Sequence, residues 1–137
     1  MISKITIEPR YQETDQMGII HHSVYPIWYE MGRVKFCADI HLPFHVIEEK
    51  GVRLAMYELT SRYLKPTKFG EIYTMQTKLV KLSKVRLFFE YHIYDYLGEL
   101  VHIGKTELIW LNDELKPTNV EKRHPEIYHA FLNEVVS

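Results

Sequence analysis

The stretch VYPIWYEMGRVKFCADI, residues 24–40, decides the fold class that we expect. Its apolar residues recur at intervals of three and four positions, which predicts an α-helix. They lie on nearly every side of that helix, so we expect the helix to be buried and not laid on a surface. Ser23 is the predicted N-cap, because a serine hydroxyl can accept from the free N–H groups of a first turn. Pro26 then falls in the first turn, where its missing N–H costs no hydrogen bond.

The pattern on either side of this helix is that of β-strands. Stretches rich in β-branched and aromatic residues are separated by turn signals, and the last two predict a tight hairpin. The first strand is expected near a sheet edge, because Pro9 cannot donate to a ladder. The predicted strands are residues 4–11, 53–63, 71–80, 86–96 and 100–112, with shorter helices after Pro43 and over residues 125–136. One long apolar helix and a meander of strands predict an α+β domain with an antiparallel sheet packed on the helix.

Length and charge exclude several classes of protein. The chain has 137 residues, a net charge of −1 and one cysteine. We expect one domain over residues 1–137, since domains typically run ~100–150 residues. The near-zero charge argues against bulk capture of nucleic acid or an anionic membrane. A lone cysteine forms no internal disulfide, and we find neither a signal peptide nor a membrane span, so we expect a cytoplasmic protein.

The segment YQETDQMGIIHHSVY, residues 11–25, carries the candidate chemistry. It places Asp15, Gly18 and His22 just before the predicted helix, whose N-terminus offers unpaired N–H groups and partial positive charge. Such groups can hold a carbonyl oxygen on which negative charge develops. Asp15, brought close by a turn at Gly18, could then attack the carbonyl or deprotonate a water. An aspartate in such a loop can instead be a cap or a turn former.

The same segment resembles a known family. The run Asp15-x-x-Gly18-x-x-x-His22-x-x-Tyr25, followed by Trp28-Tyr29-Glu30, is similar to the 4-hydroxybenzoyl-CoA thioesterase-like group of hotdog-fold acyl-CoA thioesterases. The resemblance is strongest to small bacterial members that hydrolyse short acyl thioesters. It extends through Tyr63-x-x-Pro66 and the predicted strands.

This resemblance implies a fold and a set of site residues. The hotdog fold is a curved antiparallel sheet wrapped around one long helix. Asp15 is implied as the catalytic nucleophile or general base, and the backbone N–H at His22 as the donor to the thioester carbonyl. Gly18 and Tyr25 are implied to bind substrate. Glu30 is implied as a polar floor of the acyl pocket, although a salt bridge to Arg33 or to another subunit is the plainer interpretation.

A second candidate region would bind the coenzyme A part of the substrate. Residues 72–89 contain no acidic residue but four basic ones, and coenzyme A carries phosphates. Ser83, Lys84 and Arg86 lie at the predicted turn between two strands, where relatives hold the nucleotide part of coenzyme A. They are therefore candidate substrate-binding residues, and the alternative is an ordinary solvated hairpin tip.

The prediction is a thioesterase that hydrolyses an acyl-CoA or acyl carrier protein thioester to a free acid and a thiol. We expect no cofactor and no metal, since His21 and His22 lack a third ligand at recognisable spacing. We expect a homodimer or homotetramer, because one sheet around one helix leaves the pocket open. The alternatives are a non-catalytic acyl-CoA-binding module and another hotdog enzyme such as a dehydratase. The identity of the acyl group stays open.

Overall fold

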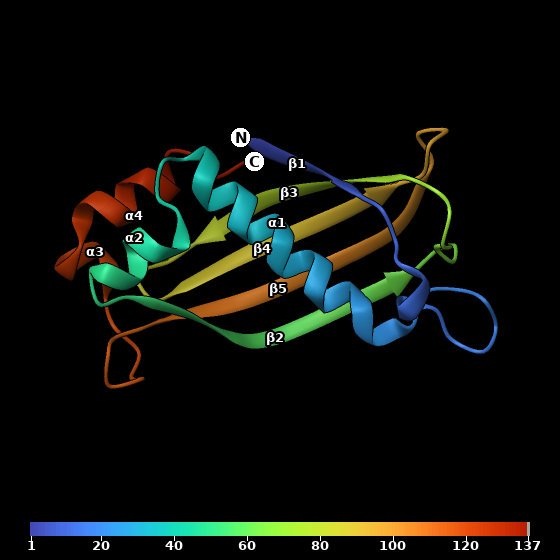
Figure 1. Cartoon of the computed structure of the whole chain (residues 1–137). Helices are drawn as coiled ribbons and strands as arrows, with labels where there is room; N and C mark the ends of the chain where they lie inside the picture. Colours follow the sequence, from blue (N-terminus) through green and yellow to red (C-terminus); the bar gives the residue numbers. More distant parts are fainter. Residues whose placement is uncertain (137) are drawn as a thin grey trace.

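A computed structural model describes residues 1–136, in which five antiparallel strands form one sheet in the order β1-β3-β4-β5-β2 (Figure 1). The strands are β1 (Ile2–Ile7), β2 (Arg53–Tyr63), β3 (Tyr73–Leu82), β4 (Arg86–Tyr94) and β5 (Leu100–Leu111). The first strand therefore lies at an edge of the sheet, which confirms its predicted position, and β2 forms the other edge.

A single long helix, α1 (Tyr25–Asp39), crosses one face of the curved sheet (Figure 1). Three shorter helices gather near the end of α1, namely α2 (Phe44–Glu49), α3 (Val120–Arg123) and α4 (Pro125–Leu132). The α+β architecture of an antiparallel sheet around one long helix is thus confirmed. None of the helices in residues 1–136 has the length and apolar character needed to cross a membrane.

The core lies between α1 and the sheet. Alternate residues of the central strand β4 face the helix, and each is at most 1% exposed: Leu87, Phe89, Tyr91 and Ile93. On the helix, the residues that pack against them are Trp28, Tyr29 and Phe36, and none is more than 3% exposed. Burying a large apolar side chain of this kind stabilises a fold by about 1.5–3 kcal/mol. This interface therefore holds α1, and the loop that leads into it, in a fixed position.

The outer side of α1 is not buried in one chain. Ile27, Met31 and Val34 are 55%, 46% and 44% exposed. The expectation that the whole helix is buried is therefore wrong for the single chain. The physical reason is that the sheet covers only one side of α1, and nothing in residues 1–136 covers the opposite side.

The start of α1 also differs from its prediction. A short 3-10 turn, His22–Val24, precedes the helix, so the capping position moves back to His21. The Ser23 N–H donates to Nδ1 of His21 at 3.1 Å, and the Ser23 hydroxyl contacts the same nitrogen at 2.8 Å. The prediction of Ser23 as N-cap was wrong, because the chain enters α1 through a tighter turn. The first strand ends at Ile7, before Pro9, and α4 ends at Leu132.

Candidate active site

The loop before α1 folds back on itself at Gly18. Thr14 and Ile20 form a β-bridge, and the Asp15 N–H donates to the Ile19 carbonyl at 2.8 Å. Gly18 has φ +78°, a left-handed conformation that side chains rarely adopt, and its N–H donates to the Asp15 carbonyl at 3.1 Å. The predicted turn at Gly18 is confirmed. Its effect is to bring Asp15 back towards the head of the helix.

The Asp15 carboxylate is half-buried and only partly engaged. Its Oδ1 accepts from the N–H groups of Met17, at 2.8 Å, and Ile19, at 3.4 Å. These bonds form an Asx turn, so the interpretation of Asp15 as a turn former is confirmed. Oδ2 receives no hydrogen bond from the described residues, so one carboxylate oxygen is left for other partners.

Asp15, His22 and Tyr25 line one pocket of about 320 Å³. The remaining lining residues are mostly apolar and come from the loop and from the end of β2: Met17, Ile19, Ile20, Tyr63, Leu64, Lys65 and Pro66. The Tyr63 hydroxyl donates to the His22 carbonyl at 3.4 Å, which joins the last residue of β2 to the head of α1. The structure therefore brings together three of the predicted site residues, and it places Gly18 in the turn beside them.

In the 3-10 turn before α1, two of the three N–H groups already have hydrogen-bond acceptors. The Ser23 N–H donates to His21 Nδ1, and the Val24 N–H donates to the His21 carbonyl at 3.0 Å. The His22 N–H donates to no residue among those described. The peptide N–H assigned to the carbonyl oxygen is therefore available, at a residue that lines the pocket.

Glu30 does not join this pocket. Its side chain is exposed on α1, and it makes no ion pair within residues 1–136. Arg33 is 5% exposed and donates from Nη1 to the Tyr91 hydroxyl at 3.0 Å. The salt bridge suggested between Glu30 and Arg33 is therefore not formed, because the guanidinium turns under the helix towards β4.

The turn between β3 and β4 lies at the other end of the sheet from Asp15. Arg86 is opposite Ile109, which pairs with Ala55 near the start of β2. Tyr63 ends β2 eight positions later, roughly 25 Å away at ~3.3 Å per residue. The Ser83 hydroxyl accepts from the Arg86 N–H at 3.0 Å and so stabilises the turn, and Lys84 is exposed at its tip. Within one chain these candidates do not meet the Asp15 pocket.

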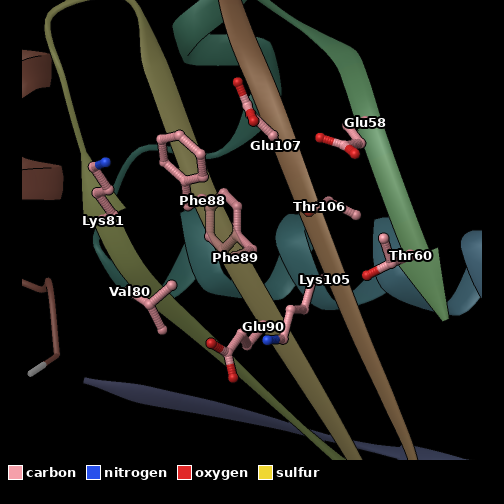
Figure 2. A pocket seen from close by; sticks show the side chains of 10 residues that line it. All are labelled: Glu58, Thr60, Val80, Lys81, Phe88, Phe89, Glu90, Lys105, Thr106 and Glu107. Carbon is pink, nitrogen blue, oxygen red and sulfur yellow. The ribbon is translucent and has the colours of Figure 1, made fainter. Parts of the chain in front are cut away.

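Arg86 already has a partner on the face of the sheet away from α1. Its guanidinium forms an ion pair with Glu107 and lies 4.3 Å from the ring centre of Tyr57. Glu107 lines a shallow hollow of about 310 Å³ on that face, with Phe88 on the neighbouring strand (Figure 2). Arg86 is thus the least available of the three residues for a phosphate.

Sequence reasoning missed two features of the site. Tyr63 was noted only as part of the Tyr63-x-x-Pro66 motif, yet it forms a wall of the pocket. His102, wholly buried on β5, lies directly behind that wall. No spacing pattern identifies His102, because its neighbours come from α1 and β2, which are distant in the sequence.

Comparison with known proteins agrees with the fold. An antiparallel sheet packed around one long helix is the architecture of the hotdog-fold thioesterases. The chain belongs to the thioesterase-like superfamily, whose family profile matches residues 9–131.

Individual relatives support the same family. The chain is 34% identical over 131 residues to a Bacillus subtilis (strain 168) protein named as an acyl-CoA thioesterase, and the match covers 95% of each. It is 30% identical to a chloroplast acyl-acyl carrier protein thioesterase of Arabidopsis thaliana, over 85% of this chain and 63% of that protein. The crystal structure of a DHNA-CoA thioesterase from Staphylococcus aureus superposes with a TM-score of 0.91 at 30% identity, over 96% of this chain and 89% of that one.

Proposed function

We propose that this thioesterase hydrolyses acyl-CoA thioesters to a free acid and coenzyme A. One observation carries the proposal: a partly unengaged carboxylate, Asp15, and an unoccupied peptide N–H, that of His22, line the same apolar pocket. The relatives from Bacillus subtilis and Staphylococcus aureus, whose names specify CoA esters, support CoA as the carrier of the acyl group.

The two groups divide the reaction between them. The His22 N–H would donate to the thioester carbonyl oxygen as negative charge develops there, in a pocket whose apolar walls weaken solvent screening. Asp15 would either attack the carbonyl carbon, forming an anhydride that water then cleaves, or take a proton from the attacking water. In both routes water supplies the hydroxyl group of the acid, and the sulfur leaves as the thiol. Gly18 and Tyr25 would shape the substrate site around these groups.

We propose that the enzyme assembles as a homodimer or a homotetramer. The free edge of β2 exposes Met56 and Tyr57, which are 43% and 59% exposed. An unpaired edge with apolar side chains is a favourable surface for pairing with a second strand. We propose that two copies pair along β2.

The same pairing would bring the candidate coenzyme A-binding residues of one chain to the pocket of the other. When two identical β2 edges pair antiparallel, the two copies run in opposite directions. The β3–β4 turn of one chain then lies near the Asp15 end of the other. Ser83, Lys84 and Arg86 would then serve the partner's pocket, with Lys84 as the main contact to a phosphate. Glu30, exposed on α1, would face the second copy or the acyl group.

A panel of acyl-CoA and acyl carrier protein thioesters, read by thiol release, tests the proposed function. Turnover of one or more acyl-CoA esters supports it. If only acyl carrier protein thioesters are turned over, the substrate carrier is acyl carrier protein, as in the name of the Arabidopsis relative, and not coenzyme A. Binding of coenzyme A with no turnover of any ester would instead indicate the non-catalytic binding module.

A further inference from the structure

A polar cluster lies inside the core behind the proposed site. The Tyr29 hydroxyl, on α1, contacts Nε2 of His102 at 2.5 Å and the hydroxyl of Ser61 at 2.6 Å. Tyr29 and His102 are both wholly buried. Buried polar groups are costly unless they are hydrogen-bonded, so a buried histidine with only one bonded ring nitrogen needs a physical reason.

The histidine in this cluster is uncharged. Burial lowers the pKa of His102 to about 4, and it raises the pKa of the Tyr29 hydroxyl far above its ordinary value. No carboxylate in residues 1–136 forms an ion pair with His102, and its Nδ1 has no hydrogen-bond partner among those residues. His102 is not among the residues that line the pocket, so its contacts with neighbouring rings have to account for its position.

The ring of His102 supports two tyrosines of the pocket. It stacks on Tyr25 with centroids 4.0 Å apart and planes 9° apart. The ring of Tyr63 meets it edge-on at 4.9 Å and 80°, and meets Tyr25 at 5.2 Å and 89°. Tyr25 and Tyr63 both line the pocket that contains Asp15 and His22. The imidazole is therefore the inner face of an aromatic wall whose outer face meets the pocket.

The far side of His102 is fixed in turn. Tyr29 stacks on Tyr91 at 4.5 Å, and the Tyr91 hydroxyl contacts Thr106 Oγ1 at 2.7 Å. Tyr29 can lie this close to β5 only because residue 104 is glycine. The histidine is thus held from behind by a hydrogen bond and presents a flat face to Tyr25.

We propose that His102 is a positioning residue, whose ring holds Tyr25 and Tyr63 in place as the wall against which the acyl group of the substrate binds. This inference rests on the proposed function and deepens it. Because Asp15 and the His22 N–H are not touched by the imidazole, its loss should weaken binding of the acyl group and leave the chemical step nearly intact.

Three variants test the role, with thermal melting of each to measure stability. His102→Ala removes the ring and is expected to raise KM for an acyl-CoA ester about tenfold, with kcat within about threefold of the wild type. His102→Phe keeps a stacking ring but loses the hydrogen bond to Tyr29, and is expected to restore KM while Tm stays low. Ser3→Ala is the matched control, because it removes the buried hydrogen bond to Asp39 at the other end of α1 and should lower Tm without changing KM.

Two results would overturn the proposal. One is an unchanged KM in His102→Ala; the other is a KM that follows Tm across all three variants, which would indicate a purely structural role. Dissociation constants for a non-hydrolysable thioether analogue of benzoyl-CoA give the same comparison without turnover. If the wild-type protein hydrolyses no ester but the analogue binds with this order of affinities, the proposed function fails and the positioning role stands.

Discussion

The ring of Tyr29 lies directly against the backbone of Gly104. A Cβ at residue 104 would stand 2.2 Å from Cζ of Tyr29 and 2.4 Å from its hydroxyl oxygen. Real atoms do not approach so closely, so the position of Tyr29, and through it that of His102, depends on the absence of a side chain on β5.

Gly104→Ala should therefore destabilise the protein by about 1–3 kcal/mol, the usual cost of overpacking a core. Urea unfolding measures the change. The double variant with Tyr29→Leu, which removes the clashing ring atoms, should lose less than the two single variants together. An alanine at 104 with wild-type stability would contradict the close contact.

Acid should weaken the fold through His102. Burial holds its pKa at about 4 in the folded state, below the ordinary value of 6.5. Between these values the unfolded chain binds more protons, so the stabilisation is fully present above about pH 6.5 and is lost as the pH falls towards 4. The shift corresponds to roughly 3 kcal/mol at about 1.36 kcal/mol for each pKa unit.

This linkage is measured as a difference between two proteins, because carboxylates also titrate in this range. Unfolding free energies of wild type and His102→Phe, taken at pH 7 and at pH 4.5, should converge at the lower pH. Parallel pH profiles for the two proteins would show that His102 does not carry the effect.

A substitution of Lys84 tests the proposed binding site for coenzyme A. Lys84→Ala should raise KM for an acyl-CoA ester several-fold with little change in kcat, because a phosphate contact remote from the thioester binds substrate and transition state equally. The effect should shrink at high salt, which screens exposed charges. Lys4→Ala, an exposed lysine on the opposite edge strand β1, is the control and should leave KM unchanged. If the KM of Lys84→Ala equals that of the wild type, Lys84 is not part of the site.

Met56 tests the proposed pairing of two copies along β2. Met56 is 43% exposed in one chain, and Leu132 on α4 has the same exposure. If β2 pairs with a second copy, Met56→Lys should shift the protein towards monomers in sedimentation experiments and lower its activity, while Leu132→Lys should do neither. A dimer that survives Met56→Lys unchanged would place the interface elsewhere.

The strand and helix pattern of this fold could be predicted because it is written in local periodicity. The helical period over residues 24–40 and the β-branched stretches after it gave element boundaries within a few residues. Ser23 was misjudged because capping depends on the turn by which the chain enters the helix. The exposed side of α1 was missed because periodicity shows that a face is apolar but not whether anything covers it.

The site residues that could be predicted from the sequence are likewise those that lie close together along the chain. Asp15, Gly18 and His22 are close in sequence, and their loop brings them together by local hydrogen bonds. Tyr63 and His102 come from β2 and β5, and only the register of the sheet places them near Tyr25. Their contribution depends on packing between distant segments, which spacing along one chain does not encode.

The activity of Asp15→Asn tests the central claim most directly. Asparagine keeps the Oδ1 acceptor that holds the N–H groups of Met17 and Ile19, so the loop and the melting temperature should be preserved. Because the amide can neither attack the thioester nor take a proton from water, kcat for acyl-CoA hydrolysis should fall by at least about a hundredfold. A folded Asp15→Asn protein with near wild-type kcat would contradict the role of Asp15 and with it the proposed mechanism.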